Sequence, residues 1–140
     1  MNPKYVIIIQ CEFAKQRCSG FACTNAFYNK EEMFQDYNAT TRYIAFSCGN
    51  CSGRGISTKL AHLARKLKAK NGLSPDQTVI HLASCMVTDN HHYDRCPHLD
   101  YIKAIIAKKG FPNVVEGSYI SPKAKKKREE GIYKNYESRM

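Results

Sequence analysis

Tyr5-Val6-Ile7-Ile8-Ile9, near the start of the chain, is short, continuously apolar and rich in β-branched residues. Such a run is typical of a strand that is covered on both faces, as in a parallel sheet. Similar runs occupy residues 42–46 and 78–83, and a shorter one occupies 114–116. Helical patterns separate these runs, and strands that alternate with helices favour a parallel sheet. The sequence therefore predicts a single layered α/β domain with a mostly parallel sheet of about four strands and flanking helices.

The helical patterns differ in strength. Residues 21–28 and 30–36 give two short patterns. A longer amphipathic pattern ends at Asn71-Gly72, a common stop signal, and its apolar residues recur at helical spacing at Ile56, Leu60, Leu63 and Leu67. Pro97 suits the first turn of a helix. We therefore expect a further helix that starts with Cys96 as its N-cap and ends at Gly110.

The charge is concentrated in part at the end of the chain. The 140 residues carry a formal net charge of +10. We predict a domain over residues 1–120 and a basic tail over residues 121–140, which contains the run Lys123-Ala124-Lys125-Lys126-Lys127-Arg128. This run could bind phosphates, and the simpler interpretation is a solvated terminal segment. Nucleic-acid binding is disfavoured because no helix-turn-helix or zinc-finger spacing is present.

The cellular compartment determines whether the cysteines are expected to form disulfides. No apolar run approaches the ~20 residues of a membrane span, so we expect no membrane association. Residues 1–4 lead directly into the first predicted strand without the apolar region of a signal peptide. We therefore expect a cytoplasmic protein, in which disulfides are rare. The seven cysteines then indicate metal binding or redox chemistry rather than a disulfide framework.

Five of the cysteines lie next to predicted element ends. Cys11, Cys48 and Cys85 follow predicted strands, whereas Cys51 and Cys96 precede predicted helices. Ligand sites in parallel sheets lie outside the carboxyl ends of the strands, so these thiols are expected to converge there. The predicted metal ligands are Cys48, Cys51, Cys85 and Cys96, with Cys11, Cys18 and Cys23 completing or flanking the site and His98 as a further ligand or its hydrogen-bonding neighbour.

Cys48-x-x-Cys51 leaves a second function open. Two thiols at this spacing can face one metal ion or form a small disulfide ring. The glycine-rich turn leads into a helix, whose positive end lowers the pKa of a nearby thiol. A thiol–disulfide redox enzyme that uses Cys48 or Cys51 as nucleophile, activated by Arg54, is therefore the alternative. The five other cysteines count against it, because such a catalyst needs only two.

Three segments taken together resemble the CGGC-domain family. They are Cys48-Gly49-Asn50-Cys51-Ser52-Gly53-Arg54, His81-Leu82-Ala83-Ser84-Cys85-Met86 and Cys96-Pro97-His98. The pattern spans residues 4–118. It departs from the family's usual motif at Asn50, in place of glycine, and at Ser52, in place of proline, and it keeps both thiols. The resemblance implies a metal-binding domain and no particular reaction.

The identity of the metal group remains a choice between two. Soft thiolates suit both an iron–sulfur cluster and zinc, and four cysteines suffice for either. A structural zinc stabilises a small fold by on the order of 10 kcal/mol. A chain of this length does not need that help. An iron–sulfur cluster is therefore slightly favoured over zinc, with an electron-transfer or sensing role and a redox partner protein.

Overall fold

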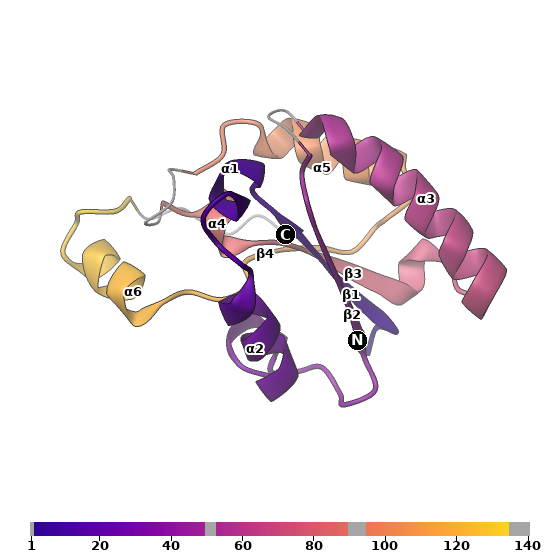
Figure 1. Ribbon diagram of the computed structural model, residues 1–140, viewed down its shortest axis with the longest axis horizontal. Helices are drawn as coiled ribbons and strands as arrows, with labels where there is room; N and C mark the ends of the chain where they lie inside the picture. Colours follow the sequence, from indigo (N-terminus) through magenta and orange to yellow (C-terminus); the bar gives the residue numbers. More distant parts are fainter. Residues whose placement is uncertain (1, 50–52, 90–94, 135–140) are drawn as a thin grey trace.

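The computed structural model describes residues 2–49, 53–89 and 95–134. In this part of the chain, four parallel strands form one sheet in the order β2-β1-β3-β4 (Figure 1). Their bounds are β1 (Tyr5–Gln10), β2 (Arg42–Ser47), β3 (Thr78–Leu82) and β4 (Val114–Glu116). The predicted α/β class and the parallel sheet of four strands are confirmed.

Helices cover both faces of the sheet (Figure 1). One face carries the two longest helices, α3 (Arg54–Asn71) and α5 (Leu99–Lys108). The opposite face carries α2 (Phe21–Asn29) and the 3-10 turn η1 (Glu32–Phe34). The remaining elements are α1 (Glu12–Lys15), the 3-10 turn η3 (Pro75–Gln77), α4 (Ser84–Val87) and α6 (Pro122–Glu129). Among the described helices, none has the length and apolar character needed to span a membrane.

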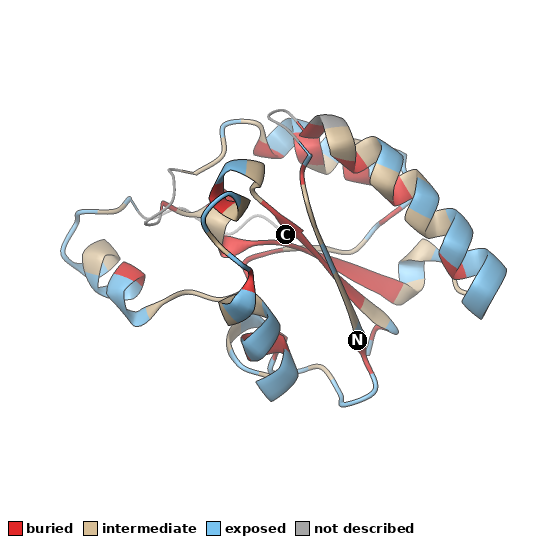
Figure 2. Cartoon of the chain, viewed as in Figure 1, coloured by how far each residue is buried: buried red, intermediate tan, exposed pale blue. Residues whose placement is uncertain are grey.

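The position of β1 between β2 and β3, with helices on both faces, explains why its sequence is almost entirely apolar. Ile7 and Ile9 pack into the core under α3 and α5, whereas Val6 and Ile8 face the core under α2. All four side chains are fully buried, and Figure 2 marks most of β1 and β3 as buried, whereas β2 is only partly buried. Burying such a side chain contributes roughly 1.5–3 kcal/mol. The core is therefore closed on both sides by protein alone.

Two local predictions are wrong. The pattern over residues 30–36 forms only the short turn η1. The helix expected to start with Cys96 starts later, because the His98 carbonyl is the first to accept a helical N–H, from Ile102 at 2.9 Å. His98 is therefore the N-cap of α5. Cys96 lies in the turn before it, where its Sγ accepts the His98 N–H at 3.4 Å.

Part of the predicted basic tail is helical and contacts the body of the protein. The Ser121 side chain caps α6 by accepting the Ala124 N–H at 3.1 Å. Within the helix, Arg128 donates to the Asp89 carbonyl at 3.4 Å. Beyond the helix, the Lys134 N–H donates to an Asp89 carboxylate oxygen at 3.2 Å. A capped helix with contacts to the loop after α4 positions its basic residues, which the sequence pattern did not indicate.

Candidate metal centre

Three cysteines follow the carboxyl ends of three adjacent strands. Cys11 comes directly after β1, Cys48 directly after β2, and Cys85 in the short helix after β3. The strands are in parallel register, with Gln10 opposite Ser47. Because β2, β1 and β3 are neighbours in the sheet, these cysteines all lie at one edge of it.

Cys85 has three other cysteines around it. Its Sγ accepts the Cys11 backbone N–H at 3.4 Å. Cys11, Cys18 and Cys23 raise the pKa of Cys85 when they ionise; Cys11 and Cys18 precede α2, and Cys23 lies within it. Cys18, Cys23 and Cys85 line one cavity of about 390 Å³, which we call the thiol pocket. The structure therefore places three thiols near Cys85, two of them in the same cavity.

A sharp turn between α1 and α2 positions Cys18. The Cys18 N–H donates to the Ala14 carbonyl at 2.8 Å, which closes the end of α1. Gly20 has φ +84°, a left-handed conformation that favours glycine, and an added Cβ there would lie 2.8 Å from the Lys15 Nζ. The Gly20 N–H donates to the Cys18 Sγ at 3.4 Å. The turn thereby fixes Cys18 beside the start of α2.

Two serines fix Cys23 relative to Cys85. Ser84 and Ser118 exchange hydrogen bonds, since each backbone N–H donates to the other's hydroxyl, at 3.1 and 3.0 Å. The Ser118 hydroxyl also lies 3.2 Å from the Cys23 Sγ and is fully buried. This Ser84–Ser118 pair joins α4, α2 and the segment after β4. Sequence analysis missed it, because a single serine in each of two distant segments gives no pattern.

Burial controls the protonation of Cys85. It raises the pKa of the Cys85 thiol to about 12, the Cys11 N–H opposes this rise, and the neighbouring thiols add to it when they ionise. Without a bound cation the thiol is therefore protonated at neutral pH and is a weak nucleophile. A metal ion would provide the positive charge that this buried sulfur needs to ionise.

The other predicted ligands are placed differently. Cys48 is 7% exposed and belongs to the apolar core under α3. Cys96 packs against the same core. Its N–H donates at 2.8 Å to the carbonyl of Met86, the residue that follows Cys85 in the sequence. Cys51 lies outside the described residues. The structure therefore places Cys11, Cys48, Cys85 and Cys96 against the core on the α3 side of the sheet, and Cys85 also lines the thiol pocket with Cys18 and Cys23.

The Cys48 turn is closely packed against the start of α3. The Gly55 N–H donates to the Cys48 carbonyl at 3.1 Å. A Cβ added to Gly49, which has φ +78°, would lie 2.8 Å from the Gly55 Cα, so both positions require glycine. Gly49 therefore lets the loop approach the start of α3 closely.

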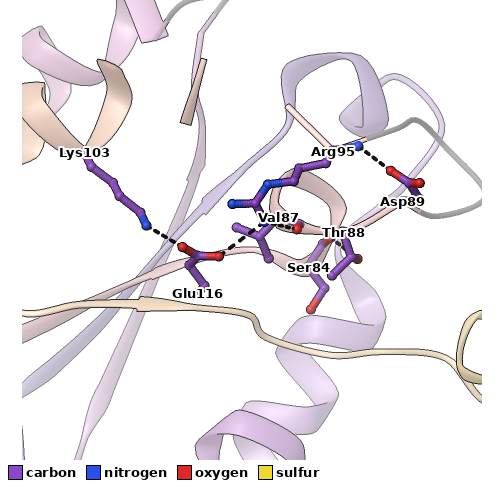
Figure 3. A network of polar contacts seen from close by, with 7 residues as sticks. All are labelled: Ser84, Val87, Thr88, Asp89, Arg95, Lys103 and Glu116. Atoms are coloured by element: carbon purple, nitrogen blue, oxygen red, sulfur yellow. Dashed lines mark hydrogen bonds and ion pairs between the residues drawn. The ribbon is translucent and has the colours of Figure 1, made fainter. Parts of the chain in front are cut away.

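A buried ion network holds the segments that carry Cys85 and Cys96 (Figure 3). Glu116, at the end of β4, pairs with Lys103 and with Arg95, whose guanidinium lies 3.3 Å away. The Glu116 side chain is 3% exposed. Arg95 also donates to the Val87 carbonyl at the end of α4, and its N–H donates to Asp89 at 2.9 Å. This network ties α4 and the segment before α5 to the sheet.

The donor chemistry fits a soft metal, although the donors stand apart. In residues 2–49, 53–89 and 95–134, no three His, Cys, Asp or Glu side chains are close enough together to hold one metal ion. Backbone N–H groups already donate to three sulfurs, those of Cys18, Cys85 and Cys96. Such bonds are characteristic of thiolates that bind metals, where they adjust the electronic properties of the site. Metal binding at the thiol pocket would therefore require its thiols to close around the metal.

Comparison with known proteins identifies the family. The search of curated proteins and the search of solved structures returned no match. The family model described as the CGGC domain matches residues 5–119, which extend from β1 to just past β4 and include all seven cysteines. Domains of this family are generally metal-binding. The match covers most of the chain, and the chain therefore belongs to the CGGC domain family.

Proposed function

We propose that this protein binds an iron–sulfur cluster at the carboxyl edge of its sheet, with Cys85 as the central ligand. The observation that carries the proposal is the convergence of Cys11, Cys18 and Cys23 on Cys85. Four thiols from separate segments, gathered at the ligand-binding edge of a parallel sheet, are the donor set that such a cluster uses.

The proposed roles of the cysteines follow from their surroundings. Cys85 and the three first-loop thiols would hold the group, and the Cys11 and Gly20 N–H groups would stabilise the ionised sulfurs. The remaining predicted ligands stay candidates for the same or an adjoining site: Cys48, Cys51, Cys96 and His98. A bound cluster would supply reversible one-electron transfer.

The closed core supports a cluster over a structural zinc. The central residues Ile7, Ile80 and Phe34 are fully buried by the sheet and its helices. Because the sheet and helices already bury a complete core, a metal is not needed to hold this fold. An iron–sulfur cluster with an electron-transfer or sensing role is therefore a better match to this fold than a structural zinc. A redox partner protein would exchange the electron with the cluster. The cytoplasm is the compartment we propose, since it keeps thiols reduced.

The thiol–disulfide alternative receives less support. One of its two candidate nucleophiles, Cys48, is 7% exposed and is packed in the apolar core, and the other, Cys51, lies outside the described residues. A catalytic thiol is partly exposed in an electropositive environment, so that it can ionise and reach a disulfide. The burial of Cys48 does not match that requirement.

The proposal is tested on protein purified without oxygen. We expect coloured protein with visible absorption that disappears on exposure to air, together with iron and sulfide in stoichiometric amounts. Colourless protein with stoichiometric zinc would overturn the cluster and keep the metal-binding proposal. Protein that takes up neither metal, even after anaerobic reconstitution with iron and sulfide, would overturn both.

A further inference from the structure

The thiol pocket has a cationic rim. Lys15 of α1 and Lys123, Lys127 and Arg128 of α6 line the same cavity as its cysteines. The cavity volume of about 390 Å³ lies in the range of small-molecule sites, roughly 300–1,000 Å³. Four cations around a cavity of this size form a site for a small anion.

Within residues 2–49, 53–89 and 95–134, none of these four cations forms an ion pair with a carboxylate. Among the residues that the structure describes, the ion pairs of α6 involve its other lysines, Lys125 with Glu32 and Lys126 with Glu130. Arg128 instead donates to a backbone carbonyl, and its Nε is a buried donor without a partner in the described part of the chain. A buried donor without a partner is costly, and an anion in the pocket would satisfy it.

Two chemically different groups of side chains line the pocket. The cations lie mainly on α6, whereas the thiols of Cys18, Cys23 and Cys85 come from α2, α4 and the turn before α2. Tyr119 and Tyr133 also line the cavity, and the Lys127 ammonium lies 5.3 Å from the centre of the Tyr133 ring. A ligand that spans this pocket would therefore be anionic at one end and would meet sulfur at the other.

We propose that the thiol pocket binds a small anionic thiol, whose carboxylates contact the α6 cations and whose sulfur lies against the pocket cysteines. The sulfur end of this inference rests on the proposed metal-binding function, since the ligand's thiolate would then join the cysteines as a donor to a soft metal. The anionic end rests only on the cavity and its cations.

Two calorimetric titrations of the full chain test separately how the pocket binds the anionic end and the sulfur end of the ligand. The first titrates S-methylglutathione, which has the carboxylates and no free thiol, into metal-free reduced protein. We expect measurable binding that weakens as salt increases. The second titrates glutathione and S-methylglutathione into metal-loaded protein. We expect glutathione to bind roughly tenfold or more tightly than its S-methyl form, because only glutathione can donate a thiolate.

Charge variants of α6 assign the binding to this pocket. Lys127→Gln and Lys123→Gln each remove one pocket cation, and each is expected to lower the binding affinity for S-methylglutathione roughly tenfold. Lys126→Gln is the matched control, because it makes the same change on the same helix with a side chain that is 76% exposed and outside the pocket. Arg128→Gln is the stronger variant, and the two lysine variants preserve the test if its loss disturbs the Asp89 contact.

Each outcome has one consequence. If S-methylglutathione does not bind, or binds Lys127→Gln and Lys126→Gln equally well, the anion site is overturned. If inorganic phosphate binds as tightly as glutathione, or the S-methyl form equals glutathione on loaded protein, the thiol specificity is overturned. If the protein takes up no metal, the proposed function fails together with the sulfur end, while the first titration still decides the anion site.

Discussion

Replacing Ser118 with alanine tests whether the Ser84–Ser118 pair positions the thiol pocket. The substitution removes the hydroxyl that accepts the Ser84 N–H at 3.1 Å and contacts the Cys23 Sγ at 3.2 Å. Ser118 is fully buried, so the Ser84 N–H is left in the interior without its acceptor. A buried donor that loses its partner costs about 1–3 kcal/mol, and we expect Ser118→Ala to be destabilised by about 2 kcal/mol.

Urea unfolding of metal-free reduced protein measures this effect. With a slope of about 2 kcal/mol per molar urea, the midpoint should fall by about 1 M. Ser19→Ala is the matched control, since Ser19 is exposed and accepts only the Phe21 N–H, at 3.3 Å. Its midpoint should change by about a quarter as much or less. Equal midpoints for the two variants would refute the role given to the Ser84–Ser118 pair.

The same variant links stability to function. Because Ser118 holds Cys23 and the start of α4, its loss should also weaken metal binding by about 10- to 100-fold, the usual cost of removing a group that orients a ligand. Competition with a chelator measures this affinity. A Ser118→Ala protein that is destabilised and still binds metal as tightly as the wild type would show that the pair supports the fold alone.

Three further predictions follow from buried polar groups. Glu116→Ala should lower the free energy of unfolding by about 3 kcal/mol, because it leaves Arg95 and Lys103 without their buried carboxylate, and a thermal melt that is unchanged would contradict this. Burial lowers the pKa of His81, so below about pH 6.5 the unfolded chain gains a proton that the folded protein does not, and denaturant titrations should show stability falling from pH 7 to pH 5; a flat profile would argue against this burial. The pKa of Cys85 is raised to about 12, so metal-free protein should lose stability as the pH rises above about 8.5, where only the unfolded thiol ionises, and Cys85→Ala should lack that loss.

The sheet could be predicted from the sequence because each strand carries its signal locally. Residues 6–9 of β1 are all apolar, so the strand presents apolar side chains on both faces, and the structure buries both faces. The helix α3 was equally clear, since its apolar residues recur at helical spacing and Gly72 ends it in a left-handed conformation. The short helices α1 and α4, of four residues each, give no such periodic signal.

The division of the cysteines could not be predicted in the same way. Strand ends place Cys11, Cys48 and Cys85 at one edge, and this follows from the parallel order. Which thiols meet depends instead on the turn at Gly20 and on the Ser84–Ser118 pair, neither of which has a periodic pattern. The position of α6 over the pocket likewise depends on contacts with Asp89, which lies 39 residues before Arg128.

The metal content of two cysteine variants tests the central claim most directly. Cys85→Ser and Cys48→Ser each remove one thiol from the carboxyl edge: Cys85 lines the thiol pocket, and Cys48 is buried outside it. After anaerobic reconstitution with iron and sulfide, both variants are analysed for iron, sulfide and visible absorption. We expect Cys85→Ser to lose the cluster and Cys48→Ser to retain most of it. A Cys85→Ser protein with the full wild-type content of iron and sulfide would contradict the account.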